Sequence, residues 1–377
     1  MTESMKLFSF VSKSAKQQDY FLVACFGLLV MFGLIMLASA SAGLGKADFN
    51  DSYYYLRHQI YYGLSLGVIG FLLASKVYYG FYKSRLFSVG FLIFTCVLLA
   101  LVFSPLGLSA GGATRWLNLG PFSFQPAELL KLSLVIYLAS WLCRKDSRQK
   151  TLVSGLVPLL VVLAIVSALL IFQHSTSPVA ILLAVALIMY FISGARLRYL
   201  ACIVLVGVVA ISLLVMITPY RVTRVLNFLN PEADPSGSGY HLIQSKTAIG
   251  AGKIMGVGYG QSTVKNYLPE PIGDSIFAII GEELGFLGSI ALVGLFAFLV
   301  IRIFLVAQKT SDPFGRLLLV GFGSIIGIQA VVNIGAMSGV LPLTGTPLPF
   351  ISYGGTNLAV FMTMMGVVVN ISKYSAK

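Results

Sequence analysis

One carboxylate, Asp274, lies where general-base chemistry could take place. It follows the rigid turn LPEP (268–271) and precedes an apolar run of helical length. Partial withdrawal from water raises the pKa of a carboxyl group, and a pKa nearer neutrality suits a general base. Aspartate is also a good N-cap, so a capping role for Asp274 stays open. Glu270 lies four residues earlier, but Pro271 and Gly273 intervene, so we do not interpret the two carboxylates as an acid and base pair.

Four further ionisable residues lie inside apolar runs, where charged groups are costly and usually functional. Glu128 and Lys131 in QPAELLKL are three residues apart, so they share a helix face and can pair. Glu282 and Glu283 in GEELG point about 100° apart on a helix, so at most one of them is expected to face a cavity. For both pairs, a structural ion pair and a contact with substrate stay open.

No metal-binding or nucleotide-binding motif stands out. His58, His174 and His241 are scattered without HExxH spacing, and the four cysteines lack CxxC spacing. The glycine turn GVGYGQS (256–262) resembles a phosphate-cradling loop, but no strand precedes it and no helix begins at it, so we reject that interpretation. The motifs therefore indicate no particular cofactor. Carboxylates near a pyrophosphate can nevertheless bind Mg²⁺ or Mn²⁺ without a recognisable motif.

The elements that position these residues are predicted to be membrane-spanning helices. The chain of 377 residues is 57% hydrophobic and 10% charged, with a mean hydropathy of +0.90, whereas a soluble domain carries about 25% charged residues. This composition excludes a soluble enzyme and a disordered chain. Apolar runs of about 20 residues match spanning helices and not barrel strands. The ten runs are 20–43, 58–75, 84–104, 125–143, 152–172, 177–194, 198–218, 275–306, 314–341 and 351–371.

The basic residues predict the topology. The net charge of +13 reflects 26 Lys and Arg residues, most of which fall in alternate short connections. Such a bias marks the cytoplasmic side of a membrane protein, so we expect no nucleic-acid partner. We predict an all-α polytopic fold with both termini in the cytoplasm. Residues 1–19 and 373–377 are the tails, and 20–372 form a single membrane domain of about ten helices.

Three polar or irregular segments are predicted to build a site on the outer side. Residues 219–274, between the seventh and eighth helices, form a connection too long to be idle. Within them, 240–256 has the apolar spacing of a short amphipathic helix. Irregular backbone at membrane depth survives only where it is buried or lines a cavity. The stretches 109–126 and 341–355 therefore predict an outward cavity roofed by 219–274.

Four ordered motifs carry a family resemblance. GGATRWLNLGPFSFQPAELLKL, HLIQSKTAIGAGKIMGVGYGQS, NYLPEPIGDSIFAIIGEELGFLG and VNIGAMSGVLPLTGTPLPFISYGG resemble the SEDS family (shape, elongation, division and sporulation) over about residues 110 to 372. The segments LPEP and PLPFISYGG are more similar to the family's division member than to its elongation member. The resemblance implies a peptidoglycan glycosyltransferase that polymerises lipid II, the membrane-lipid-linked precursor, on the outer face of the cytoplasmic membrane.

The resemblance also implies roles for particular residues. The family's essential aspartate maps to Asp274, which would accept the proton of the acceptor hydroxyl. Its Glu and Lys on the fourth helix map to Glu128 and Lys131, and its GEELG carboxylates map to Glu282 and Glu283. These four positions are candidates for contact with substrate.

A departing pyrophosphate requires cations. The candidates on the outer side are Arg115, Arg221, Arg224, Lys246 and Lys253.

The sequence departs from the family at two places. Many members read Q-P-D-x-G after the fifth helix, whereas this chain reads QHSTS at 173–177. The usual His-Thr before the aspartate is replaced by Ile272 and Gly273. The first change leaves no aspartate to which the family's role at that position could be assigned.

The resemblance further implies partners and a location. The expected partners are a class B penicillin-binding transpeptidase of the FtsI type and other membrane proteins of the division machinery, at the division septum. The alternatives are an elongation polymerase, a lipid II flippase, and a scaffold without activity. A flippase would favour inverted repeats and a charged path through the bilayer, which we do not find in the sequence.

Overall fold

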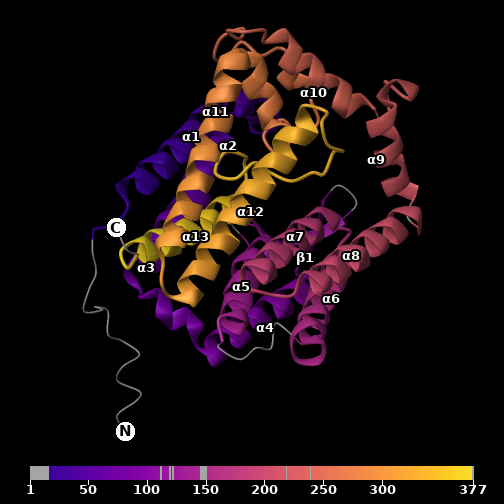
Figure 1. The fold of residues 1–377 in the computed structure, drawn as a ribbon. Coiled ribbons are helices and arrows are strands. Elements are labelled where there is room, and N and C mark those ends of the chain that lie inside the picture. Colours follow the sequence, from indigo (N-terminus) through magenta and orange to yellow (C-terminus); the bar gives the residue numbers. More distant parts are fainter. Residues whose placement is uncertain are drawn as a thin grey trace.

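The computed structural model describes residues 17–110, 113–118, 120, 123–144, 151–217, 219–237 and 239–375. Within them, a helix coincides with each of the ten predicted apolar runs, so the predicted helical membrane architecture is confirmed (Figure 1). The second and fifth runs also contain π-helical turns, η2 (Gln59–Leu64) and η5 (Leu152–Leu156). The ten helices are α1 (Tyr20–Phe49), α3 (Ser65–Lys76), α4 (Arg85–Leu101), α5 (Pro126–Leu142), α6 (Val157–Phe172), α7 (Thr176–Ile192), α8 (Leu197–Ile217), α11 (Ile276–Lys309), α12 (Pro313–Met337) and α13 (Gly355–Ser372).

Length and composition identify this as a multi-pass membrane protein. Five described helical stretches are long and apolar enough to cross a bilayer: α1, the continuous η5–α6 stretch, α11, α12 and α13. Large apolar side chains on the outer helices are exposed, such as Leu205 at 65% and Phe94 at 53%. Water would penalise such surfaces, whereas lipid accommodates them.

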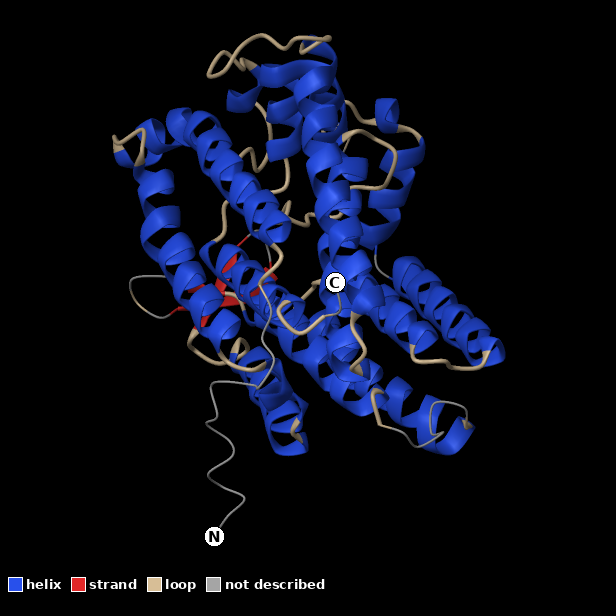
Figure 2. Cartoon of the chain, turned by 60° about the vertical axis from the view of Figure 1, so that its left-hand side comes forward, coloured by secondary structure: helices blue, strands red, loops and turns tan. Residues whose placement is uncertain are grey.

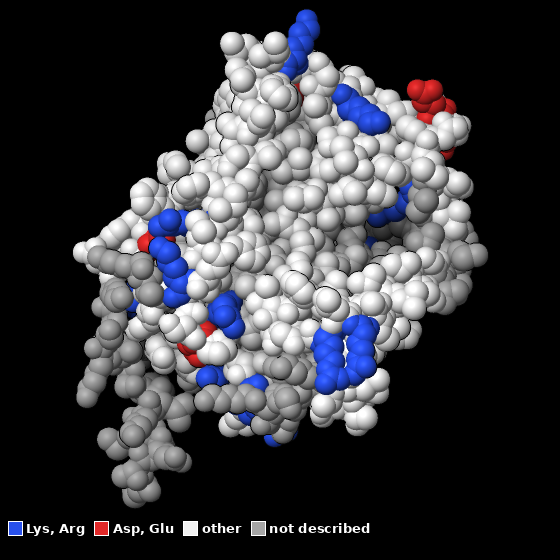
Figure 3. Space-filling view, viewed as in Figure 1, with Lys and Arg blue, Asp and Glu red and all other residues white. Residues whose placement is uncertain are grey.

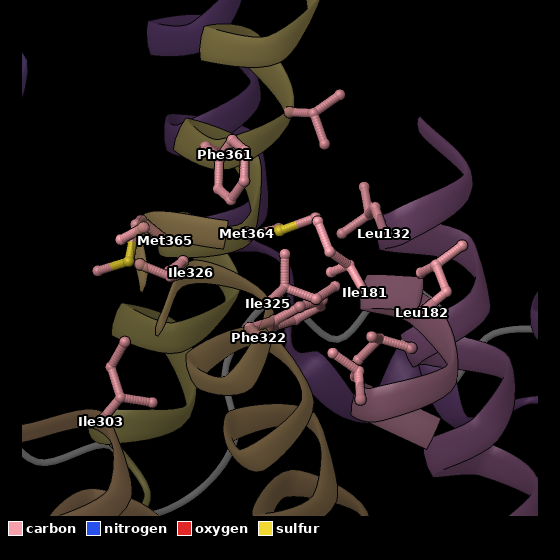
Figure 4. Packing of buried hydrophobic residues seen from close by; sticks show 14 of the residues in the cluster. Leu132, Ile181, Leu182, Ile303, Phe322, Ile325, Ile326, Phe361, Met364 and Met365 are labelled. Carbon is pink, nitrogen blue, oxygen red and sulfur yellow. The ribbon is translucent and has the colours of Figure 1, made fainter. Parts of the chain in front are cut away.

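The centre of the bundle is formed by α5, α12 and α13, which are buried along most of their length. Figure 4 shows Phe322 and Ile325 of α12 packed between Met364 of α13 and Ile181 of α7. Along its side, α13 packs against α3 and η2, while α12 packs against α11, α7 and α5. Buried helices that are apolar on every side are expected at the centre of a membrane bundle.

Helix α1 lies antiparallel to α11 and crosses the 341–355 loop. The Cys25 thiol donates to the Leu295 carbonyl at 3.4 Å, and the Ser39 hydroxyl donates to Glu283 at 2.6 Å. Between these contacts, Gly33 touches the loop backbone: a Cβ there would lie 2.5 Å from the Phe350 oxygen. The close approach therefore requires glycine at this position.

The stretch 109–126, which we expected to be irregular, contains most of a small antiparallel sheet (Figure 2). Its strands are β1 (Gly107–Ala110), β2 (Ala113–Asn118) and β3 (Ser123–Phe124), in the order β1-β2-β3. Leu108 pairs with Trp116, and Leu117 pairs with Phe124. Strand pairing satisfies backbone groups that would otherwise be unpaired beside the membrane. The all-α description therefore omitted one small element.

The long connection folds over one end of the bundle, at the top of Figure 1. It contains α9 (Pro219–Leu229), which the sequence analysis did not predict, η6 (Pro231–Ala233), α10 (Tyr240–Ala251) and η7 (Val264–Asn266). The predicted helix at 240–256 is confirmed as α10 but ends five residues earlier. It stops because Lys253 has a φ of 47° and the following residues pair with α11. The remaining short helices are α2 (Tyr54–His58) and η3 (Tyr79–Lys83).

Gly33→Ala should destabilise the folded protein by about 1–3 kcal/mol, because the new methyl group must displace loop backbone. Gly27→Ala is the matched control on the same helix, since no atom lies within 4 Å of a Cβ built there. Thermal unfolding of the detergent-purified protein measures both variants. Equal Tm values for the two variants would contradict the close approach.

Candidate functional site

Asp274 lies in the turn that leads into α11, and its carboxylate does not cap the helix. The helix begins at Ile276, and its N-cap residue is Ser275. Asp274 Oδ1 is buried and has no hydrogen-bond partner among the described residues. The capping alternative is therefore wrong, and a carboxylate oxygen remains available for another group.

The surroundings of Asp274 raise its pKa to about 7. Burial is the main cause, and the negative charge of Glu270 adds to it; backbone N–H groups and Arg224 act in the opposite direction. Glu270 is exposed and has a φ of 47°, so it belongs to the turn and not to a shared helix face. The pair therefore interacts electrostatically, and near neutral pH Asp274 is poised to gain or lose a proton.

The backbone of the Asp274 turn is held from two sides. Asn333 of α12 donates one amide hydrogen to the Asp274 carbonyl at 2.8 Å and the other to the Thr346 carbonyl at 2.7 Å. The Tyr353 N–H donates to the Ile272 carbonyl at 2.8 Å. Sequence reasoning missed Asn333, although a polar side chain within the ninth apolar run was the available signal.

A histidine holds the residue after Asp274. Ser275 donates its hydroxyl hydrogen to the Pro269 carbonyl at 2.6 Å, and His241 Nε2 lies 2.6 Å from the same hydroxyl oxygen. Since Ser275 has only one hydroxyl hydrogen, Nε2 must carry the hydrogen of this second bond. Burial, followed by the charge of Arg224, lowers the pKa of His241 to about 4. The imidazole is therefore neutral at physiological pH.

Glu128 and Lys131 form the predicted pair, at 2.8 Å, and both are almost fully buried. Lys131 Nζ also donates to Gln329 Oε1 of α12 at 2.7 Å and lies 5.4 Å from the centre of the Phe361 ring of α13. Gln329 in turn donates to the Pro347 carbonyl at 2.8 Å. The pair thus joins the three central helices to the 341–355 loop, which supports the structural interpretation.

Both carboxylates of GEELG also hold structure together. Glu282 accepts hydrogen bonds from the Ser262 hydroxyl and from the Thr263 N–H at 3.1 Å. Glu283 accepts from Ser39, and Lys265 Nζ lies 3.6 Å from the same oxygen. The glycine turn at 256–262 is therefore fastened to a protein carboxylate.

Helix α11 is broken at Gly285, where φ is 65°. Residues 253–258 run beside the break and fill it with four backbone hydrogen bonds: Val257 and Gly258 donate to the carbonyls of Glu282 and Glu283, and Phe286 and Leu287 donate to those of Lys253 and Ile254.

Of the five predicted cations, the structure brings Arg224 to the Asp274 turn. Arg224 Nη1 donates to the Leu343 carbonyl at 3.2 Å, and its charge lowers the pKa of both Asp274 and His241. Figure 3 shows a hollow between α8 and α9 with basic side chains inside it.

The other four cations have different surroundings. The Arg115 guanidinium donates to the His174 carbonyl at 2.6 Å, between α6 and α7. Lys246, beside Gly339, and Lys253 are exposed. The Arg221 side chain lies outside the described part of the structure.

The described residues contain no group of three His, Cys, Asp or Glu side chains that could hold a metal ion. The acidic groups nearest the site are Asp274 and Glu270, and both Glu282 and Glu283 are engaged by protein donors.

Comparison with known proteins finds one family over almost the whole chain. A family model described as "Cell cycle protein", covering FtsW, RodA and SpoVE, matches residues 19–377. A protein of Geobacter metallireducens named probable peptidoglycan glycosyltransferase FtsW is 38% identical over 96% of both chains. Stage V sporulation protein E of Bacillus subtilis is 37% identical over 95% of this chain and 97% of its own.

Solved structures share the fold. A chain from a peptidoglycan synthase complex that coordinates polymerization and crosslinking superposes with a TM-score of 0.76, at 30% identity, over 95% of this chain and 98% of that chain. The rod shape determining protein RodA of Thermus thermophilus superposes with a TM-score of 0.69, at 26% identity, over 96% and 98%.

Lys131→Ala should destabilise the protein by about 3–5 kcal/mol, because it leaves the Glu128 carboxylate buried and unpaired. Replacing both residues, as in Glu128→Leu with Lys131→Met, should recover much of this loss. Thermal unfolding measures the single and double variants. A double variant that is less stable than Lys131→Ala would contradict a mainly structural pair.

Asp274→Asn should make the folded protein more stable at pH 8. Burial raises the pKa of the carboxyl from 3.8 to about 7, so ionisation opposes folding. The gain should be small near pH 4, grow as pH rises, and be complete above about pH 7. Tm measured across this range is the test, with Glu232→Gln, at an exposed carboxylate, as the control. A gain that does not change with pH would contradict the burial of an ionisable Asp274.

Proposed function

The chain belongs to the FtsW, RodA and SpoVE family of cell cycle proteins, and on this premise we propose that it is a peptidoglycan glycosyltransferase that polymerises lipid II. The observation that carries the proposal is Asp274. It combines a buried oxygen that has no hydrogen-bond partner among the residues that the structure describes, a pKa raised to about 7, and a turn whose backbone is held by Asn333 and Tyr353. A preorganised carboxylate near its own pKa at neutral pH suits general-base catalysis.

The proposed reaction is a single displacement. Asp274 accepts the proton of the acceptor sugar's 4-hydroxyl as that oxygen attacks the anomeric carbon of the donor. The new glycosidic bond forms while the bond to the lipid pyrophosphate breaks, so an α-linked donor becomes a β-linked glycan. The charge of Arg224 lowers the pKa of Asp274, so among the described cations Arg224 is best placed to stabilise the leaving pyrophosphate.

The remaining candidates have supporting parts in this proposal. The two buried groups of candidates stabilise the fold around the site through the contacts described above: Glu128 with Lys131, and Glu282 with Glu283. Lys246 and Lys253 provide positive charge on the exposed surface of the 219–274 segment. Mg²⁺ or Mn²⁺, if used, enters with the pyrophosphate of the substrate. The hard oxygen ligands that such ions prefer are those of the phosphates.

We further propose a class B penicillin-binding transpeptidase as partner and the division septum as location. The support is that the synthase complex with a similar chain couples polymerization to crosslinking, and that several relatives carry the name FtsW. An outer-face site would release glycan where a transpeptidase could crosslink it. Association with further division membrane proteins belongs to the same proposal.

Asp274→Asn should reduce lipid II polymerisation by about 10²–10⁴-fold, because the amide cannot accept the proton. The measurement is the initial rate with labelled lipid II and the transpeptidase partner present. The control is Glu232→Gln, which removes an exposed carboxylate in η6 and should leave the rate unchanged. Full polymerisation by Asp274→Asn would refute the assignment.

The polymerisation rate should rise with pH through about 7 and level off above it, since the base must be deprotonated. Glu270→Gln should move this midpoint to lower pH, because the Glu270 charge contributes to the raised pKa of Asp274. Rates measured between pH 5.5 and 9, at saturating lipid II, check both outcomes. If Glu270→Gln leaves the midpoint unchanged, the titrating group is not Asp274.

A further inference from the structure

Six rings from separate segments form an aromatic cluster beside the Asp274 turn. Phe49 stacks on Tyr54 with ring centres 3.6 Å apart, Tyr55 meets Tyr353 edge-on at 5.3 Å, and His58 lies 4.7 Å from Tyr62. The cluster joins the end of α1, the α2–η2 segment and the loop before α13. Its members are Phe49, Tyr54, Tyr55, His58, Tyr62 and Tyr353.

Two independent observations place the cluster at the level of Asp274. Burial is the main cause that raises the pKa of Tyr55, and the charge of Glu270 in the turn is among the further causes, so the two side chains lie close enough to interact. A direct bond reaches the same turn, because the Tyr353 N–H donates to the Ile272 carbonyl at 2.8 Å. The cluster thus shares a backbone contact with the turn that carries the proposed base.

Hydrogen bonds make the cluster a fixed surface. The Tyr353 hydroxyl and His58 Nδ1 are 2.9 Å apart, and the Tyr55 hydroxyl donates to Asp48 at 2.8 Å. Gln59 is 1% exposed and accepts from the Gly354 N–H at 3.0 Å, so η2 is fastened to the same loop. A π-helical turn such as η2 is frequently found at functional sites.

The cluster differs from an interfacial aromatic belt. Belt residues face the lipid headgroups singly, whereas these rings stack on one another across three segments. Helix α1 has 30 residues and is therefore about 45 Å long, which exceeds the roughly 30 Å of a hydrocarbon core. Its last turns carry Lys46 and Asp48 beside Phe49, which is 48% exposed; because charges are costly in hydrocarbon, we expect this end of the helix to lie outside that core. Asp48 accepts a hydrogen bond from Tyr55, and the Asp51–Arg57 ion pair lies in the same segment of the chain.

We propose that this aromatic cluster is a binding subsite for sugar units of the nascent glycan strand, a β-linked polymer of N-acetylated hexoses. Pyranose rings present apolar C–H faces that stack on aromatic rings, while their polar edges bond to hydroxyls and carboxylates. The cluster offers both kinds of group next to the carboxylate at which each new bond would form. Strand retention there keeps the growing end near Asp274 between additions.

This inference rests on the proposed function for the identity of the polymer, but its binding test does not need catalysis. The probe is the soluble tetramer of β-1,4-linked N-acetylglucosamine, titrated calorimetrically into the detergent-purified full chain. Tyr54→Leu keeps an apolar side chain and removes the ring, so it should weaken tetramer binding roughly 3–10-fold. Tyr54→Phe retains the ring and should bind within about twofold of wild type.

A second aromatic group provides the matched control. Tyr78, at the opposite end of α3, lies 5.2 Å from Tyr374 and 4.8 Å from Tyr79, ring centre to ring centre. Tyr78→Leu should leave tetramer binding unchanged. An unchanged Tm for Tyr54→Leu shows that the variant folds; if its Tm falls, Tyr62→Leu, in which η2 keeps its Gln59 bond, takes its place.

Gel separation of the products of labelled lipid II gives the second readout. Tyr54→Leu should shorten the strands severalfold relative to Tyr78→Leu. Tetramer binding and strand length that are equal in the two variants would overturn the subsite. A wild-type chain that binds the tetramer through Tyr54 but makes no polymer would instead overturn the proposed function and leave the subsite standing.

Discussion

Irregular backbone inside a membrane protein must find hydrogen-bond partners within the protein, and the site depends on how the 341–355 loop meets this constraint. Two amide side chains one helical turn apart on α12 supply much of the answer. Gln329 donates to the Pro347 carbonyl, and Asn333 donates to the carbonyls of Thr346 and Asp274. The Ser352 hydroxyl accepts from the Leu348 N–H at 2.7 Å and closes the loop on itself.

The same two amides connect groups that are distant in the sequence. Lys131 bonds to Gln329, so the buried ion pair of α5 supports the loop from below, while Asn333 supports the Asp274 turn from the loop side. Neither amide is more than 1% exposed. A group buried this deeply is costly to leave unpaired, and this cost favours one arrangement of the loop over its alternatives. The Glu128–Lys131 pair, the 341–355 loop and the Asp274 turn lie far apart in the sequence. They nevertheless belong to one hydrogen-bonded framework.

Local patterns predicted the helices well, because hydropathy and length are properties of a continuous segment. The Glu128–Lys131 pair was predictable for the same reason, since a spacing of three residues fixes their relative direction on a helix. The small sheet was missed because its strands are short and its pairing includes a register shift between Leu108 and Ser109 that composition does not indicate. The bond between His241 and Ser275 joins residues 34 apart, and no periodicity in either segment indicates it. Asp274 was identified as an important residue, but only the fold could separate capping from an available carboxylate.

The break in α11 at Gly285 has a consequence for how the protein assembles. The segment that fills the break, 253–258, precedes the break by about 30 residues and leaves the ribosome before it. The four backbone groups of α11 that bond to this segment can therefore be satisfied by chain that is already synthesised. Because α10 packs against α11, we expect these two elements to begin folding before α12 and α13 are synthesised. The roof of the site is then ready to receive Asn333 and the 341–355 loop when the last two helices insert.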